Sequence, residues 1–192
     1  MTFEVVSEEF DCFFVDDIYN HKKNVCGVEV VGKIADLSKL SKQYKFAIVA
    51  IGDNLLRERI TKQCLSFGFI LVSAVSKLSY ISKWAIIGDG CIILPLSSVH
   101  NGAKIGMGTV LCSHTEIHHD SQVGNFCVIY PCSVVRTYAI VGNRVRCGSN
   151  VSIGNNCVIE SNSDIPNGSV LEKQISWTKT IYLEEKQWNT FF

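Results

Sequence analysis

The feature that most constrains the fold is a six-residue repeat that runs from Val75 to Val170. Every sixth residue in this stretch is apolar, and a small residue usually stands four positions after it. The sixteen apolar positions are Val75, Ile81, Ile87, Ile93, Val99, Ile105, Leu111, Ile117, Val123, Ile129, Val135, Val141, Cys147, Ile153, Ile159 and Ile165. An α-helix requires apolar spacing near 3.6 and a half-buried strand requires alternation, so a strict period of six fits neither. It fits a triangular coil in which each hexad forms one flat side.

Three hexads form one coil of about eighteen residues, so residues 75–171 are predicted to form a left-handed parallel β-helix of roughly five coils. With the coils at strand spacing, this prism would be about 25 Å tall. Each coil covers the open edge of the one before it, which gives a continuous apolar core. Glycine often follows the inward aliphatic residue, as at Gly88, Gly106, Gly124, Gly142, Gly148 and Gly154. We expect these glycines to supply positive φ at the corners.

Residues 1–74 have the pattern of a small α/β domain, a partial nucleotide-binding fold. Short strands are predicted at residues 11–17, 45–51 and 69–75, and a helix is predicted from Asn54, with Asp53 or Asn54 as its N-cap. Strand, helix and strand in this order indicate a parallel α/β unit. Residues 172–192 lie beyond the repeat. Their aromatic residues suggest a tail, with some helical character, that packs on the prism or on a neighbouring chain.

Composition limits the classes of partner that the protein is expected to bind and indicates the cellular compartment. Eighteen basic and eighteen acidic residues give no net charge, so nucleic acid and an anionic membrane surface are not expected partners. The first ten residues lack the order of a signal peptide, and no apolar run approaches membrane-spanning length. The nine cysteines are odd in number and include no C-x-x-C pair. Free thiols in a reducing cytoplasm fit this pattern better than disulfides or zinc.

Four stretches resemble one enzyme family. They are FFVDD (13–17), FAIVAIGDNLLRERI (46–60), GFILVSAVS (68–76) and IHHDSQVGNF (117–126). With the hexads around them, they resemble the bacillosamine-type UDP-4-amino-sugar N-acetyltransferases and the related sialic-acid O-acetyltransferases. The resemblance implies a cytoplasmic homotrimer that binds acetyl-CoA along the prism, between neighbouring subunits. It also implies that the N-terminal domain holds a nucleotide-linked amino sugar and that no metal is required.

The resemblance assigns roles to seven residues. It implies His119 as general base with Asp120 beside it, Asp16, Asp17 and Gly52 as substrate contacts, and Thr137 and Ser149 as contacts to CoA. Two of the departures from the family pattern bear on these roles. No glycine-rich phosphate loop precedes Gly27, the first glycine of the chain, and Thr137 stands where the family often has glycine.

The residue types also suit acyl transfer. The acceptor must lose a proton while a thioester carbonyl is attacked, and a neutral imidazole with a reference pKa of about 6.5 suits that task. An adjacent carboxylate can fix the tautomer of the imidazole. Because His119 and Asp120 are the third and fourth residues of their hexad, we expect both at a corner of the prism. His100 and His118 have no such neighbour and are expected to be plain surface histidines.

Three alternatives stay open. His114 and His119 have the spacing of two zinc ligands in the prism-shaped carbonic anhydrases, but Leu78 occupies the position of the third ligand. The chain could instead be a catalytically inactive trimeric scaffold, which the missing phosphate loop favours. Finally, the same base could serve O-acetylation of a sialic-acid-type sugar. The resemblance favours the amine at C4 of a nucleotide-linked 4-amino-4,6-dideoxy sugar.

Overall fold

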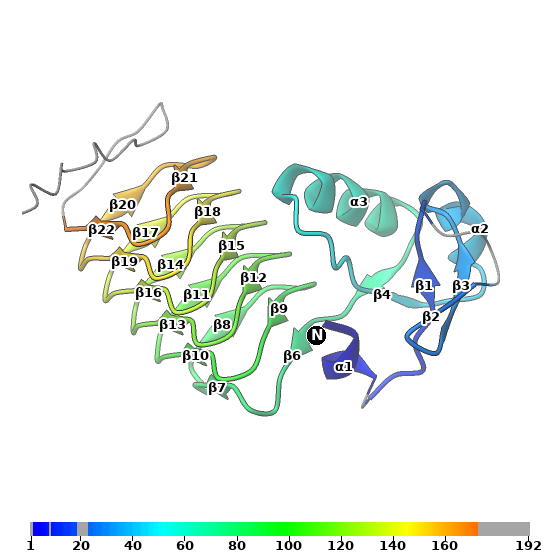
Figure 1. The fold of residues 1–192 in the computed structure, drawn as a ribbon, viewed down its shortest axis with the longest axis horizontal. Coiled ribbons are helices and arrows are strands. Elements are labelled where there is room, and N and C mark those ends of the chain that lie inside the picture. The colour runs from blue at the N-terminus through cyan, green and yellow to red at the C-terminus, as the bar shows by residue number, and fades with distance from the viewer. Residues whose placement is uncertain (1, 8, 19–22, 173–192) are drawn as a thin grey trace, which may run out of the picture.

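The structure, a computed structural model, describes residues 2–7, 9–18 and 23–172. A triangular prism of short strands lies beside a smaller N-terminal unit of helices and strands (Figure 1). The predicted tail at residues 172–192 lies outside the described residues, apart from Glu172. Among the described helices, none has the length and apolar character needed to cross a membrane.

The prism has three faces, each a stack of parallel strands. The first face contains β7 (Tyr80–Ile81), β10 (Ser98–Val99), β13 (Glu116–Ile117), β16 (Val134–Val135), β19 (Ser152–Ile153) and β22 (Val170–Leu171). The second contains β8 (Ile86–Ile87), β11 (Lys104–Ile105), β14 (Gln122–Val123), β17 (Ile140–Val141) and β20 (Val158–Ile159). The third contains β6 (Ala74–Val75), β9 (Ile92–Ile93), β12 (Val110–Leu111), β15 (Val128–Ile129), β18 (Arg146–Cys147) and β21 (Asp164–Ile165). This is the left-handed β-helix that the repeat predicts.

The register of the faces follows the eighteen-residue coil. Ile117 pairs with Val99 on one side and with Val135 on the other, and the other faces repeat this spacing. The inward aliphatic side chains stack in the centre, where Leu111, Ile117 and Ile129 have no exposed surface. Burying each such side chain contributes about 1.5–3 kcal/mol. The hexad pattern therefore describes the core correctly.

The small residues four positions later tie one coil to the next. Thr109 is fully buried, and its Oγ1 donates to the Gly124 carbonyl at 2.7 Å and accepts from the Cys127 N–H at 3.0 Å. Ser133 repeats this arrangement with the Gly148 carbonyl and the Val151 N–H. These hydroxyls satisfy backbone groups that would otherwise be buried without partners.

The prediction for the hexad glycines was wrong. None of the glycines that follow an inward aliphatic residue has positive φ. They are needed because the coils approach closely there: a Cβ on Gly106 would lie 2.5 Å from the Asn125 nitrogen, and one on Gly124 would lie 2.6 Å from the Gly142 carbonyl carbon. The left-handed residues instead occupy the fourth hexad position. They are Gly90, Leu96, Gly102, Gly108, His114, Asp120, Phe126, Cys132, Tyr138, Arg144, Asn150, Asn156, Asn162 and Gly168.

The N-terminal unit contains two small sheets. In the first, β1 (Phe14–Val15) pairs in parallel with β3 (Val28–Gly32), and β3 pairs in antiparallel fashion with β2 (Asn24–Val25). In the second, β4 (Phe46–Ala47) pairs in parallel with β5 (Ile70–Leu71). The helical segments are α1 (Thr2–Val6), the 3₁₀ turn η1 (Ile34–Asp36), α2 (Leu37–Leu40) and α3 (Asn54–Ser66). The predicted strand–helix–strand unit is present as β4, α3 and β5.

Helix α3 begins where the sequence predicts. The Asp53 carboxylate accepts from the Leu56 N–H at 2.7 Å, which makes Asp53 the N-cap. The helix lies along the corner between the second and third faces. There Asn54 donates to the carbonyls of Arg144 and Val145, and Glu58 forms an ion pair with Arg144 at 3.2 Å.

Arg57 joins α3 to the prism. Its side chain has no exposed surface, and all of its recorded hydrogen-bond partners are carbonyl or amide oxygens. Nε and Nη2 donate to the prism carbonyls of Gly108, Phe126 and Cys127, and the remaining bonds go to Ile51, Gly52 and Asn54. Burial lowers the pKa of the Arg57 guanidinium. Only a planar group with five donors can satisfy this arrangement, so lysine would not replace it.

All nine cysteines lie in the described part of the chain, and none of them is in a disulfide. Burial raises the pKa of the Cys91 and Cys127 thiols to about 11 and that of Cys147 to about 12. At neutral pH these side chains are therefore neutral and serve as small apolar residues in the core.

Gly124→Ala tests the stacking role of the hexad glycines. The new methyl group would lie 2.6 Å from backbone atoms of Gly142. We expect a loss of about 3 kcal/mol and a melting temperature lowered by roughly 6–12 °C. Gly52→Ala is the matched control, because nothing lies within 4 Å of the Cβ it adds. Equal melting temperatures for the two variants would show that the coils can separate to admit a side chain.

Candidate functional site

His119 and Asp120 lie at the corner where the first face turns into the second, directly after β13. The Nδ1 atom of His119 is 2.9 Å from Oδ2 of Asp120, and about half of the His119 side chain is exposed. Asp120 has a φ of 58°, in the left-handed region. This conformation turns its carboxylate back toward the preceding side chain, and Asp and Asn adopt it more readily than most residues.

The coils above and below complete the surroundings of this pair. Thr137 stands one coil after His119, and its Oγ1 is 3.1 Å from Nε2. The Tyr138 ring meets the imidazole edge to face, with centroids 5.8 Å apart and planes at 81°. On the other side, a Cβ at Gly102 would collide with Oδ1 of Asp120. Glycine at 102 thus leaves room for the carboxylate.

These contacts fix the tautomer of His119. An ionised carboxylate only accepts hydrogen bonds, so the bond to Asp120 requires the proton on Nδ1. Nε2 then carries the lone pair and accepts from the Thr137 hydroxyl. An imidazole held in this way keeps Nε2 unprotonated, and its side chain is about half exposed, so the ring can act as a base.

Three other histidines in the described part of the chain are arranged differently. His100 and His118 stack one coil apart, with ring centroids 5.5 Å apart, and His118 Nε2 lies 3.4 Å from a Glu116 carboxylate oxygen. His114 lies at the corner between the third and first faces, so β13 separates it from His119. Within residues 2–7, 9–18 and 23–172, no cluster of three or more His, Cys, Asp or Glu side chains could hold a metal ion.

The predicted substrate contacts lie in the N-terminal unit. Asp16 and Asp17 follow β1, where Asp16 Oδ1 accepts from the Ile18 N–H at 2.7 Å and Asp17 Oδ1 accepts from the Ile34 N–H at 2.9 Å. Gly52 is exposed just before α3, and its carbonyl accepts from Arg57. Each aspartate thus stabilises a turn with one oxygen, and its second oxygen accepts no recorded hydrogen bond.

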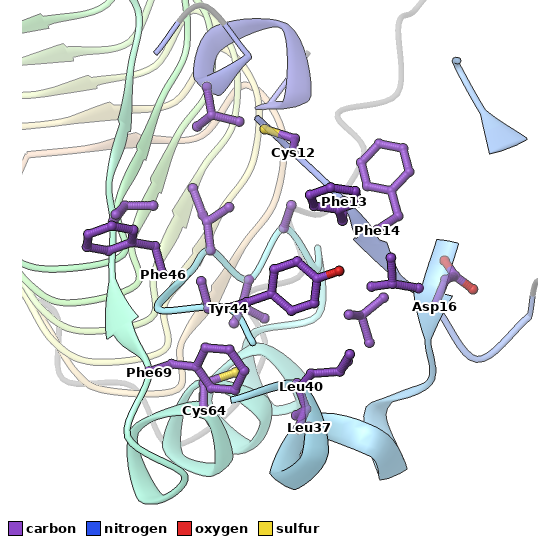
Figure 2. A pocket seen from close by; sticks show the side chains of 18 of the residues that line it. Cys12, Phe13, Phe14, Asp16, Leu37, Leu40, Tyr44, Phe46, Cys64 and Phe69 are labelled. Atoms are coloured by element: carbon purple, nitrogen blue, oxygen red, sulfur yellow. The ribbon is translucent and has the colours of Figure 1, made fainter. Parts of the chain in front are cut away.

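A cavity of about 650 Å³ opens beside Asp16, between the two small sheets. Figure 2 shows aromatic side chains around it, among them Phe13, Phe14, Tyr44 and Phe46. Its charged lining residues are Asp11, Asp16 and Lys45. An apolar wall with two carboxylates and one amine suits a ring or another apolar group better than a diphosphate. All of its lining residues precede the hexad repeat, so His119 is not among them.

The two predicted CoA contacts flank the first face. Thr137 is at the His119 corner, and Ser149 is at the corner between the third and first faces. The Ser149 N–H donates to Asn167 Oδ1 at 2.8 Å, and the Ser149 carbonyl accepts from the Gly168 N–H at 2.8 Å, so its side chain is the part most available for further contacts. Gly102 and Tyr138 were not singled out from the sequence. Gly102 lies eighteen residues before Asp120 and Tyr138 lies eighteen residues after it, so the coil length could have identified both as its neighbours.

Comparison with known proteins finds one matching family model and several structures of similar fold. Residues 6–64 match the family model described as the PglD N-terminal domain. The acetyltransferase domain of PglB from Neisseria gonorrhoeae superimposes with a TM-score of 0.84 at 24% identity, covering 90% of this chain and 84% of that one. The resemblance drawn from the sequence motifs is confirmed.

Two further structures have the same fold. WeeI from Acinetobacter baumannii has a TM-score of 0.67 at 17% identity, covering 82% of this chain and 81% of its own. PerB from Caulobacter crescentus, in complex with CoA and GDP-perosamine, has a TM-score of 0.52 at 23% identity, covering 88% and 86%. The α/β unit followed by a left-handed β-helix is therefore a fold that this chain shares with these structures, and at these identities the likeness concerns the fold alone.

The tautomer of His119 can be measured. We expect ¹⁵N NMR of the neutral protein to show the proton on Nδ1 and an unprotonated Nε2, because Asp120 accepts from the former and Thr137 donates to the latter. In Asp120→Gly, which keeps a residue suited to positive φ, this preference should be lost. A wild-type protein with the proton on Nε2 would contradict the hydrogen-bond assignment.

Proposed function

We propose that this protein transfers an acetyl group from acetyl-CoA to the 4-amino group of a nucleotide-linked 4-amino-4,6-dideoxy sugar, with His119 as general base. The observation that carries the proposal is the row of three side chains at the prism corner, in which Asp120 binds Nδ1 of His119 and the Thr137 hydroxyl lies 3.1 Å from Nε2, the nitrogen that carries the lone pair. Two of the similar structures support the choice of substrates. One is the PglB acetyltransferase domain in complex with acetyl coenzyme A, and the other is PerB with CoA and GDP-perosamine.

The chemistry follows from the geometry of the corner. The neutral amine attacks the thioester carbonyl, and its nitrogen becomes positively charged as the C–N bond forms. His119 takes up the proton, and Asp120 stabilises the imidazolium that results. The C–S bond then breaks, and the CoA thiolate receives a proton as it leaves. Asp120 thus acts through His119 and does not touch the acceptor.

A homotrimer is part of the proposal. Large apolar side chains remain exposed beside the His119 corner: Trp84 is 64% exposed and Tyr138 is 53% exposed, while Ile86 and Ile140 project from the adjoining second face. A neighbouring prism would cover them and form a cleft over His119. In this cleft acetyl-CoA would contact Thr137 and, at the far edge of the first face, Ser149.

The N-terminal unit is proposed to hold the nucleotide-linked sugar. The aromatic cavity offers Tyr44 and Phe46 as surfaces for a nucleobase, and the second carboxylate oxygen of Asp16 can accept from a base N–H. Asp17 and Gly52 are the proposed contacts to the rest of the substrate. The cavity lining contains one basic residue, Lys45, so the diphosphate would lie outside it.

Turnover tests the proposal directly. We incubate the protein with acetyl-CoA and a panel of UDP-, dTDP- and GDP-linked 4-amino sugars, and follow the release of free CoA thiol. We expect acetylation of one acceptor class and a loss of roughly 10²–10⁴-fold in kcat for His119→Ala. His100→Ala is the matched control, because the His100 ring lies in the preceding coil against Tyr80 and His118, and it should retain wild-type activity.

The product distinguishes the alternatives. An N-acetyl product survives mild alkali, whereas an O-acetyl ester is hydrolysed and would assign the chain to O-acetylation. Release of CoA that is equal in wild type and in His119→Ala would exclude His119 as the base. No turnover with any acceptor would favour the inactive scaffold.

A further inference from the structure

We infer that the hydroxyl of Thr137 relays the proton between the acceptor and His119; this rests on the proposed function. The Nε2 atom of His119 is the nitrogen that must receive the proton, since Nδ1 is bound to Asp120. Thr137 Oγ1 occupies the hydrogen-bonding position on Nε2 at 3.1 Å. An acceptor amine therefore meets the Thr137 oxygen before it meets the imidazole.

The hydroxyl is suited to this position chemically. A threonine hydroxyl has one proton to donate and two lone pairs with which to accept. With its proton donated to Nε2, the Thr137 oxygen can accept an N–H or O–H of an incoming substrate. A hydrogen-bonded chain of this kind extends the reach of the base by one side chain.

The transfer balances within the proposed reaction. As the amine nitrogen bonds to the thioester carbon, one of its protons passes to Thr137 Oγ1 while the Thr137 proton passes to His119 Nε2. Thr137 ends neutral and His119 ends as the imidazolium. When the C–S bond breaks, the thiolate takes the proton back along the same path, and CoA leaves as the free thiol.

The position of Thr137 is fixed by its coil. Its carbonyl accepts from the Asn156 N–H at 3.1 Å. The preceding residue, Arg136, donates its N–H to the Ile153 carbonyl, and Ala139, two residues after Thr137, is fully buried. A β-branched side chain also has few χ1 rotamers, so its hydroxyl is held in place. The Tyr138 ring packs edge-on against the imidazole and limits its rotation.

The arrangement is particular to this pair of coils. The third hexad position at this corner carries Lys83, Asn101, His119, Thr137 and Asn155 in successive coils. Only at 119 and 137 do an imidazole and a hydroxyl follow each other. The hydrogen bond is thus a contact between two specific side chains, and it is not repeated between the other coils at this corner.

Two substitutions distinguish the effect of the Thr137 hydroxyl on activity from the effect of the side chain's shape. Thr137→Val keeps the volume and the branching but removes the hydroxyl, and Thr137→Ser keeps the hydroxyl. We expect Thr137→Val to lower kcat by about 10- to 100-fold, a part of the roughly 10²–10⁴-fold that a general base contributes. The KM for acetyl-CoA should change less than about threefold. Thr137→Ser should recover most of the lost kcat.

A proton inventory gives a readout that a structural role would not move. In mixtures of H₂O and D₂O, the wild-type rate should show two protons in flight, and Thr137→Val should show one. Wild-type kcat in Thr137→Val, or equal losses in Val and Ser variants, would overturn the relay and leave the proposed function standing. A wild-type protein that acetylates no acceptor would overturn both.

Discussion

The site depends on one constraint: each residue of the prism lies beside the residue eighteen positions later in the sequence. It is imposed by parallel hydrogen bonds between coils and by glycines that let successive corners approach within van der Waals contact. Because of this spacing, Thr137 stands against His119 and Asp120 stands over Gly102. The proposed catalytic group is thus assembled from residues that are distant in sequence and lie on a rigid scaffold, as a positioned base would require.

The N-terminal unit depends on a second interaction, the burial of Arg57 against prism carbonyls. A buried guanidinium without a carboxylate is costly unless its donors are satisfied, and here six oxygens satisfy them. This contact fixes the unit at the corner between the second and third faces, whereas His119 lies at the corner between the first and second. In the proposed trimer, the substrate held by one protomer's unit would be acetylated at a cleft shared with its neighbour.

The sequence predicted the prism well because the residues that repeat every six positions are also the residues that form its buried core. It also narrowed the α3 cap to Asp53 or Asn54, since capping is a local interaction, and the structure shows that the cap is Asp53. The glycines after the inward residues were misread, because a small residue can be required either by dihedral angles or by close approach, and only the stacked coils decide between them. The cavity between the two small sheets was not predicted, because two-residue strands such as β1 and β4 are set by tertiary contacts. Thr137 was identified, but as a CoA contact and not as a partner of His119.

The central claim is that the corner at His119 is where the thioester reacts, and a crystal structure with bound CoA tests it most directly. The account predicts that the CoA sulfur lies within about 4 Å of the Thr137 hydroxyl or of Nε2 of His119, the separation of groups poised to react. It further predicts that the cofactor lies in a cleft between two protomers. A sulfur atom bound at another corner, with the His119 imidazole facing bulk solvent, would contradict it.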